Sequence, residues 1–271
     1  MSGTGLTTSS FLAFLSSLLV GCPADDSVIP TSLTRGRVSA DHAAVEHAAA
    51  SPEFGYFGAT GPGLWGGLDP AWGACANGHT QSPVDLAGDL VRSRSRDARV
   101  SFDYDHSTTG EIFNNGHTVE IETEGKNVLT INGVAYSLTQ FHFHSPSEHT
   151  INGDGYDMEL HLVHTSATGA TAVVAVFLDR GHTSGALSTI FDQLPNDVSV
   201  HHELEAPFDV RAFLPQAVPN VQYIGSLTTP PCTDGVHWVV LVSPETISSE
   251  QLAQFHERIH FNARPVQRSL P

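Results

Sequence analysis

Residues 140–164, QFHFHSPSEHTINGDGYDMELHLVH, contain five histidines in a segment that otherwise has the composition of two strands. Successive side chains of a strand point to opposite faces, so His142 and His144 share one face and the phenylalanines that alternate with them take the other. His161 lies in the second run, with leucines on either side. If the two strands pair antiparallel, the third imidazole reaches the first two.

Three neutral histidines that leave a fourth position open are the ligand set of one class of catalytic zinc site. A zinc-ligating imidazole also needs an acceptor for its second nitrogen. Gln140 and Glu159 each lie two residues from an expected ligand and on the same strand face, so they are placed to orient His142 and His161. The sequence therefore predicts a Zn²⁺ site with His142, His144 and His161 as its ligands.

A single histidine on a strand is more often a packed or solvent-facing residue than a metal ligand. Here a His-x-His pair, a third histidine and two acceptors on the same face occur together, and the combination favours a metal site. By the same standard His149 and His164 fall on less suitable positions, with His164 on the face opposite His161. We interpret both as structural.

Short β-rich runs surround this segment and are separated by turns such as Asn132-Gly133 and Asn152-Gly153. The runs are HTVEIET, NVLTINGVAYSLTQFHFH, MELHLVHTS, TAVVAVFL and HWVVLVS. Helical signals are few and late, where Ser243-Pro244-Glu245 and the following TISSEQLAQFHERI offer caps and then apolar residues at helical spacing. The sequence predicts an α+β domain dominated by a large, mostly antiparallel, twisted β-sheet with a few peripheral helices.

The composition excludes several partners. The 271 residues, 40% of them hydrophobic, are enough for one large folded domain and exclude general disorder. Twelve Lys and Arg stand against 29 Asp and Glu, giving a formal net charge of -17, and Lys126 is the only lysine. Nucleic acid and anionic lipid surfaces are therefore poor electrostatic partners.

The N-terminus resembles an export signal. Residues 6–21 form an apolar run that is short for a membrane span and ends in Leu19-Val20-Gly21-Cys22, which resembles a bacterial lipobox. The absence of Lys or Arg before the run departs from an ordinary export signal. We expect a signal peptide over residues 1–22, a flexible tether over 23–53 and a folded domain over 54–271. The protein is expected in the periplasm or lipid-anchored to the cell envelope through Cys22, with secretion as the alternative.

The three cysteines agree with export. If Cys22 is used in signal processing, two cysteines remain that can pair with each other, Cys75 and Cys232. Should they meet in an oxidising compartment, a disulfide closing so long a loop would stabilise the fold by roughly 4 to 5 kcal/mol in the chain-entropy model. Two unrelated buried thiols are the alternative.

Six segments, in order from about Phe54 to about Gln267, resemble the α-class carbonic anhydrases. They are FGYFGATGPGLWGGLDPAWGACANGHTQSPVDL, NNGHTVEI, QFHFHSPSEH, MELHLVH, YIGSLTTPPCTDGVHWVVL and FNARPVQ. The three-histidine zinc site described above is itself best known from this family. The resemblance implies that residues 54–271 form a catalytic domain, a lyase for the zinc-dependent reversible hydration of carbon dioxide to bicarbonate and a proton. It leaves the oligomeric state open.

The resemblance also implies roles for residues outside the histidine cluster. Thr228 would accept a hydrogen bond from the attacking hydroxide, and Glu148 would accept the Thr228 proton and so fix that direction. His117 in NNGH matches the proton shuttle, because an imidazole with a pKa of about 6.5 takes and releases a proton at neutral pH. Tyr56 matches a tyrosine that helps to hold water near the shuttle. An apolar wall for carbon dioxide would comprise Val163, Val173, Leu227, Val236 and Trp238, with Thr229 beside the substrate.

Two features of the resemblance bear on other parts of the chain. Phe54 stands where the family usually has a tryptophan, which affects packing of the N-terminal segment more than chemistry. Cys75 and Cys232 match a disulfide pair of secreted members, in agreement with the export signal.

Two other functions fit part of the pattern. His142-x-His144-x3-Glu148 matches the first motif of cupin-type metal oxygenases, in which Glu148 would ligate iron or manganese, but the chain has no Gly-rich histidine motif for the last ligand. A carbonic-anhydrase-like binding domain without chemistry typically lacks one or more zinc histidines. Here all three are present together with Thr228 and Glu148.

Overall fold

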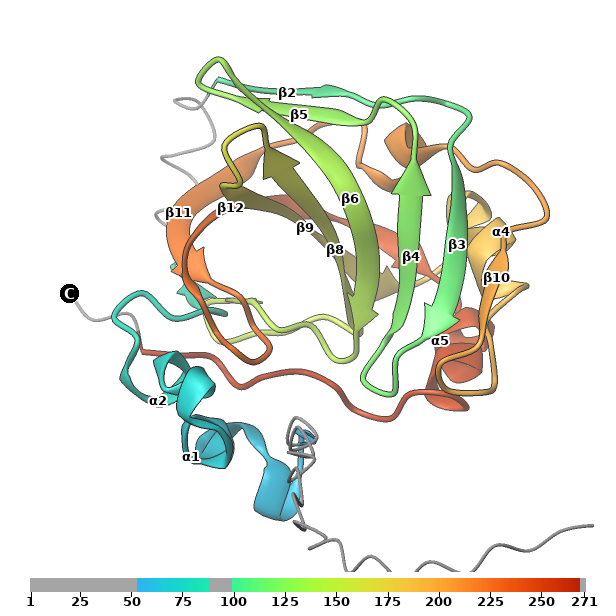
Figure 1. Ribbon diagram of the computed structural model, residues 1–271. Coiled ribbons are helices and arrows are strands. Elements are labelled where there is room, and N and C mark those ends of the chain that lie inside the picture. The colour runs from blue at the N-terminus through green and yellow to red at the C-terminus, as the bar shows by residue number, and fades with distance from the viewer. Residues whose placement is uncertain (1–52, 88–98, 269–271) are drawn as a thin grey trace, which may run out of the picture. The chain divides into compact units, whose positions relative to one another are not determined.

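A computed structural model describes residues 53–87 and 99–268, which belong to one compact unit, Ala49–Pro271 (Figure 1). The expected signal peptide with Cys22, and the expected tether apart from Glu53, lie outside the described residues. In the ranges that are described, no helix is both long and apolar enough to cross a membrane.

One large twisted sheet dominates the described part of the chain (Figure 1). Its described strands pair antiparallel except for one parallel pair, β9 with β12. The predicted sheet-dominated α+β fold is confirmed. The main order across the sheet is β10 (His201–Glu203), β3 (Thr109–Asn114), β4 (Val119–Glu124), β6 (Val134–His144), β8 (Met158–Ser166), β9 (Thr171–Arg180), β12 (Asp234–Ile247) and β11 (Asn220–Ser226).

Shorter strands complete the sheet structure. β2 (Val100–Asp103) pairs with β5 (Val128–Ile131), and β5 pairs with β6. The β5–β6 hairpin turns at Asn132-Gly133, where φ is 51° and 84°, as a two-residue turn of this kind requires. A separate two-stranded parallel pair joins β1 (Asp85–Leu86) to β7 (Thr150–Ile151).

The late helix is present but begins further along than the sequence indicates. α5 spans Ser249–His256, and its cap is Ser248, in a capping box with Gln251, rather than Ser243. The reason lies in the neighbouring strand, because β12 keeps pairing with β9 as far as Ile247. Pairing with β9 therefore holds Glu245, Thr246 and Ile247 in the strand, and Pro244 lies in the irregular stretch of β12 just before them.

Three of the described helices cover one face of the sheet. α4 (Gly185–Phe191), α5 and the short 3₁₀ helix η4 (Val210–Phe213) pack on the main core, which contains Phe141 and Phe143 of β6 and the leucines of β8. This burial fixes which face of β6 and β8 points away from the core, and His142, His144 and His161 lie on that other face.

The N-terminal segment forms short helices: η1 (Gly58–Thr60), η2 (Pro62–Leu64), α1 (Trp65–Leu68), η3 (Pro70–Trp72) and α2 (Ala74–Asn77).

Candidate metal centre and active site

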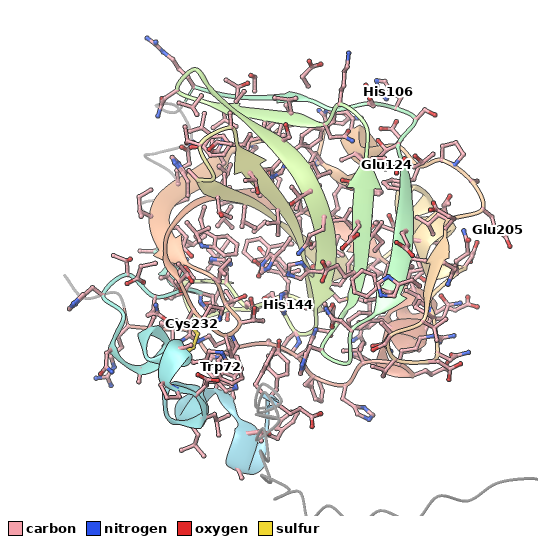
Figure 2. The ribbon with its side chains drawn as sticks, in the orientation of Figure 1. Trp72, His106, Glu124, His144, Glu205 and Cys232 are labelled. Atoms are coloured by element: carbon pink, nitrogen blue, oxygen red, sulfur yellow. A yellow bond between two sulfur atoms is a disulfide. The ribbon has the colours of Figure 1, made fainter. Side chains whose placement is uncertain are left out.

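The three predicted ligands meet at one point. His142 and His161 are direct partners in the antiparallel β6–β8 ladder, and His144 lies two residues further along β6. One ring nitrogen of each lies within 4.8 Å of the other two. His144, labelled in Figure 2, and His161 are almost fully buried, whereas His142 is partly exposed. The cluster therefore opens on the side of His142.

Two of the three imidazoles are oriented by the acceptors that the sequence indicates. The Nδ1 of His142 lies 2.8 Å from the Oε1 of Gln140, and the Nε2 of His161 lies 2.8 Å from the Oε1 of Glu159. Because the carboxylate accepts, His161 carries its proton on Nε2, and its lone pair is on Nδ1. By the same reasoning His142 presents the lone pair of Nε2.

The acceptor for the third imidazole was not predicted. The Nδ1 of His144 donates to the backbone carbonyl of Asn262, at 2.8 Å across a separation of 118 residues. The Oδ1 of Asn262 also accepts from the backbone N–H of Ser145, at 2.8 Å. A backbone carbonyl leaves no side-chain signal, although Asn262 does lie in the closing FNARPVQ segment.

Burial keeps these imidazoles neutral. It lowers the pKa of His142 well below the ordinary value and that of His144 to about 4, and it also lowers that of His161. Burial would also raise the pKa of Glu159, but His149 and His161 outweigh it and hold that pKa well below its usual range. At neutral pH the site is therefore three uncharged imidazoles supported by one ionised carboxylate.

His149 and His164 agree with the structural interpretation. The Nδ1 of His149 lies 2.6 Å from the Oε1 of Glu159, and its Nε2 lies 2.7 Å from the Tyr223 hydroxyl. Both of its nitrogens are thus used in hydrogen bonds. The Nε2 of His164 lies 2.7 Å from the Tyr104 hydroxyl, on the opposite face of β8 from His161.

A cavity of about 320 Å³ lies over the cluster, and most of the expected apolar wall lines it. Val236 is not among the lining residues; it lies in the buried apolar cluster that also contains Trp238. The cavity therefore combines two of the ligand histidines with an apolar side and three threonines. Its lining comprises Gln140, His142, His161, Val163, Thr171, Val173, Leu227, Thr228, Thr229 and Trp238.

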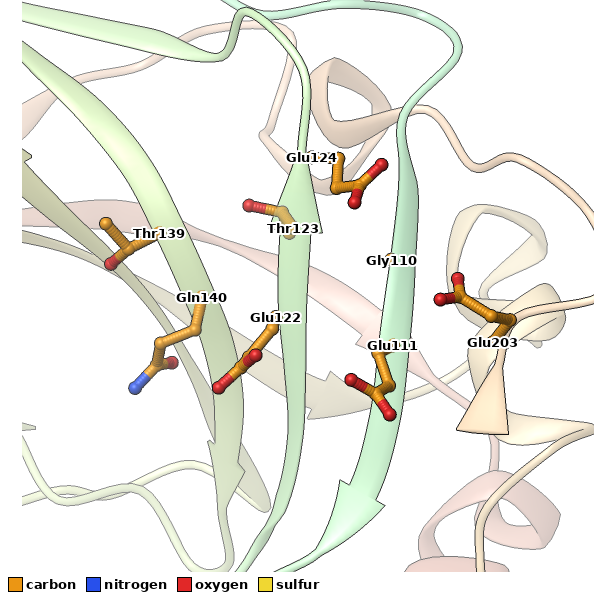
Figure 3. Close-up of a pocket in the computed structure, with 8 residues that line it drawn as sticks. All are labelled: Gly110, Glu111, Glu122, Thr123, Glu124, Thr139, Gln140 and Glu203. Carbon is orange, nitrogen blue, oxygen red and sulfur yellow. The ribbon is translucent and has the colours of Figure 1, made fainter. Parts of the chain in front are cut away.

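The register of the sheet explains why an acidic cavity adjoins the apolar one at Gln140. Residues that pair across successive strands share a face, and one such row crosses the sheet from β10 to β11. Gln140 divides it into an acidic half and an apolar half. In order, the row is Glu203, Glu111, Glu122, Gln140, Val163, Val173, Trp238 and Tyr223. The acidic half lines a second cavity of about 330 Å³, which shares Gln140 with the first (Figure 3).

Glu148 and Thr228 lie beside the cluster. The Oε1 of Glu148 accepts from the backbone N–H of Arg264, at 2.8 Å. Burial raises the pKa of Glu148 to about 7, although His161 and a side-chain hydrogen bond from Thr228 act in the opposite direction. The oxygenase alternative would require Glu148 to be a ligand of the same metal. Among the described residues, Glu148 is not part of the three-histidine cluster.

His117 lies outside the metal cavity. Its ring stacks on Phe54, with centroids 3.8 Å apart and an interplanar angle of 11°. Both line a separate cavity of about 430 Å³ together with Tyr56. Tyr56 also lines a cavity next to Glu148, so it lies between the two regions. Partial burial lowers the pKa of His117 from its ordinary value.

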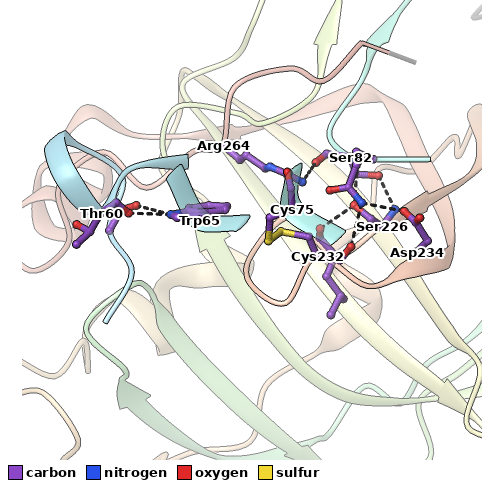
Figure 4. Close-up of a disulfide and its surroundings, with 11 residues drawn as sticks. Thr60, Trp65, Cys75, Ser82, Ser226, Cys232, Asp234 and Arg264 are labelled. Atoms are coloured by element: carbon purple, nitrogen blue, oxygen red, sulfur yellow. Dashed lines mark hydrogen bonds between the residues drawn. A yellow bond between two sulfur atoms is a disulfide. The ribbon is translucent and has the colours of Figure 1, made fainter. Parts of the chain in front are cut away.

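Cys75 and Cys232 form a disulfide across a separation of 157 residues, as expected (Figure 4). The backbone N–H of Cys232 donates to the carbonyl of Thr229, at 2.9 Å. Gln81 donates to the Cys232 carbonyl at 2.9 Å, and Arg264 donates to the Cys75 carbonyl at 3.1 Å. The disulfide therefore joins the N-terminal segment to the loop that carries the two active-site threonines.

Comparisons with known proteins identify the family of the chain. The family model described as eukaryotic-type carbonic anhydrase matches residues 60–269. A carbonic anhydrase of Pectobacterium atrosepticum is 37% identical over 221 residues, covering 81% of this chain and 89% of that protein. One from Klebsiella pneumoniae is 39% identical over 217 residues, covering 78% and 86%. The structure of an α-carbonic anhydrase from Thermovibrio ammonificans with the inhibitor sulfanilamide matches with a TM-score of 0.75 at 36% identity, covering 81% and 97%. The chain thus belongs to the eukaryotic-type, or α, carbonic anhydrase family.

Proposed function

We propose that the protein catalyses the reversible hydration of carbon dioxide to bicarbonate and a proton, with Zn²⁺ held by His142, His144 and His161. The convergence of three neutral imidazoles whose other nitrogens are already hydrogen-bonded carries this proposal. Nε2 of His144 is fully buried without a partner in the described part of the chain. An unsatisfied buried polar atom costs about 1–3 kcal/mol, so this donor set fits a cation that prefers nitrogen ligands.

When bound, zinc supplies a hydroxide near neutral pH by acidifying a water molecule, the chemistry for which carbonic anhydrases are the known example. The residues of this chain would do the rest. Val163, Val173 and Trp238 offer an apolar surface for a nonpolar substrate. Thr228 would donate its hydroxyl proton to Glu148, whose Oε2 is buried without a hydrogen-bond partner among the described residues, and its oxygen would then accept from the attacking hydroxide and orient it.

His117 would carry the proton to solvent. An imidazole titrates close to neutral pH and can both accept and release a proton. His117 is half-buried and lines a cavity that shares Tyr56 with the cavity next to Glu148. This position suits a group that exchanges protons with the bulk.

Carbon dioxide hydration measured by a stopped-flow pH-indicator assay tests the proposal. We expect zinc chelation to remove the activity and zinc addition to restore it, and elemental analysis of the purified protein to show about one zinc per chain. Full activity in metal-free protein would contradict the proposal. Iron in place of zinc would favour the oxygenase alternative.

We also propose that the protein is exported, which the Cys75–Cys232 disulfide supports because disulfides persist in oxidising compartments. Attachment of lipid at Cys22 is a further part of this proposal. Intact-mass measurement of the mature chain from its own cell tests it, with an acylated N-terminus at Cys22 as the expected result. A chain that retains residues 1–21 would contradict it.

A further inference from the structure

The Asn115 side chain binds two backbone N–H groups of the turn that carries His117. Oδ1 of Asn115 accepts from the backbone N–H groups of His117, at 2.9 Å, and of Thr118, at 2.8 Å. The Oδ1 of Asn114 accepts from the N–H of Gly116 at 2.8 Å. The backbone direction at His117 therefore depends on where the Asn115 amide lies.

Glu120 holds that amide in place. The Nδ2 of Asn115 donates to the Oε2 of Glu120, at 3.0 Å. Because the amide oxygen already faces two N–H groups, its nitrogen must face the carboxylate, and the amide has one orientation. Glu120 is itself fixed on β4, where it is the ladder partner of His142. A single chain of contacts thus runs from the strand next to the metal cluster to the His117 turn.

The turn has a second attachment on its carbonyl side. The Nδ2 of Asn262 donates to the His117 carbonyl, at 2.9 Å, and the Asn262 carbonyl accepts from the Nδ1 of His144. The His117 ring itself rests on Phe54. If the Glu120 carboxylate is removed, the contacts of the turn with Asn262 and Phe54 remain. Its loss should therefore loosen the position of His117 without unfolding the strand.

We propose that Glu120 is a positioning residue for proton transfer, acting through Asn115 on the turn that presents His117. The proposal rests on the proposed function, in which His117 is the shuttle. Glu120 is not among the described residues that line the metal cavity, so it does not act on carbon dioxide directly. Its effect should therefore fall on the proton-transfer rate, which limits kcat in dilute buffer, and not on kcat/KM for hydration.

The experiment compares Glu120→Ala, Glu120→Gln and Glu122→Ala holoenzymes by stopped-flow hydration in dilute buffer. Glu122 is the matched control, since it lies two residues along the same strand on the same face and is exposed. Glu120→Ala should lower kcat roughly three- to tenfold, part of the ~10²-fold or more that a positioned proton-transfer group contributes. Its kcat/KM should stay within about twofold, and concentrated imidazole should restore kcat. Glu120→Gln keeps an acceptor for Asn115 and should retain most of the activity.

Two further measurements separate this role from a general effect. Adding Glu120→Ala to His117→Ala should cause no additional loss of kcat, because the positioned group is already absent. Amide hydrogen exchange at His117 and Thr118, followed by NMR, should speed up in Glu120→Ala and stay unchanged in Glu122→Ala.

The proposal is overturned by an unchanged kcat in Glu120→Ala, by an equal loss in Glu122→Ala, which would indicate a field effect, or by unchanged amide exchange. A kcat that does not respond to His117→Ala alone would overturn the shuttle assignment and this role with it. Absence of hydration in the unmodified holoenzyme would instead reject the proposed function.

Discussion

The chemistry of single residues at this site depends on which nitrogen of each histidine is free. Gln140, Glu159 and the Asn262 carbonyl each occupy one nitrogen, and the remaining three nitrogens face one another. The acceptors differ in strength: Glu159 is the only carboxylate of the three, so it should raise the basicity of its ligand the most. Glu159 also accepts from the backbone N–H groups of Glu148 and His149, at 2.9 and 2.8 Å, so its position is fixed.

Substitution Glu159→Gln should weaken zinc binding by about 10- to 100-fold, as for other partners of metal-ligating histidines. In the variant, the side-chain NH₂ of the introduced glutamine replaces one carboxylate oxygen. It would then face N–H groups that donate to Glu159 in the unmodified protein. Competition with a chelator of known affinity measures the change. Glu122→Gln, an exposed substitution on β4, is the control and should bind zinc normally. Equal affinities for the Glu159 variant and the unmodified protein would contradict the prediction.

The pH dependence of kcat in dilute buffer should reflect His117. Burial lowers its pKa from 6.5, so the ring stays neutral, and able to accept a proton, as the pH falls past that value. The shuttle contribution to kcat should therefore decline only below a pH of about 6.5. Subtracting the profile of His117→Ala isolates the contribution. A decline centred above pH 7 would show that His117 is not the acceptor or is not buried as described.

At the scale of elements, the register of the sheet decides what each strand face presents. In β8, His161 points to the cavity and His164 to the opposite side, where it meets Tyr104. A slip of one residue between β6 and β8 would exchange the buried phenylalanines with the histidines, and burial of Phe141 and Phe143 opposes it. The core on one face thus enforces the site on the other.

His164 should make the stability of the fold pH-dependent. Burial lowers its pKa to about 3 in the folded protein, whereas the unfolded chain has a value of about 6.5. Between these values the unfolded state binds more protons, so the free energy of unfolding should fall as the pH drops, by up to about 1.4 kcal/mol per pH unit from this residue. Denaturant unfolding of the unmodified protein and His164→Gln at several pH values measures it.

The His164→Gln variant should be less stable at neutral pH by roughly 1–3 kcal/mol, because Tyr104 loses a well-placed partner. The difference between the two proteins should then shrink as the pH falls below about 6.5. Two parallel curves would show that His164 does not resist protonation in the folded state.

At the scale of the whole molecule, the disulfide connects parts that are distant in sequence. Cys75 lies in the short α2, and Cys232 follows the threonine loop, where it has a φ of 56°. Gln81 and Arg264 add hydrogen bonds around it. The N-terminal segment, the active-site loop and the closing segment are therefore joined at one place (Figure 4).

Replacement of both cysteines by serine, in Cys75→Ser with Cys232→Ser, should lower the free energy of unfolding by about 2–5 kcal/mol. The physical reason is that the open chain gains entropy when a long loop is no longer closed. Denaturant unfolding with and without a reductant measures the change. Reductant should destabilise the unmodified protein and leave the double variant unaffected. Equal stability of the two oxidised proteins would contradict the prediction.

The sequence alone determined the ligand trio and the two strands that carry it. Alternation in a strand follows from covalent geometry within a few residues, so the faces of His142, His144 and His161, and the acceptors Gln140 and Glu159, could be predicted locally. Turns such as Asn132-Gly133 are equally local. The helix start was predicted too early because pairing of β12 with β9 is not visible in the β12 sequence itself.

Only the tertiary structure decided the contacts that join distant segments. The Asn262 carbonyl on His144, the Arg264 N–H on Glu148 and the stacking of His117 on Phe54 each bridge more than sixty residues. Backbone groups and ring stacking leave no periodic pattern, because every residue has the same amide and carbonyl. Such contacts exist only when strand register and packing have fixed where each segment lies. The chain thus specifies its ligands locally, but the orientation of those ligands and the place of the shuttle arise from the folded molecule.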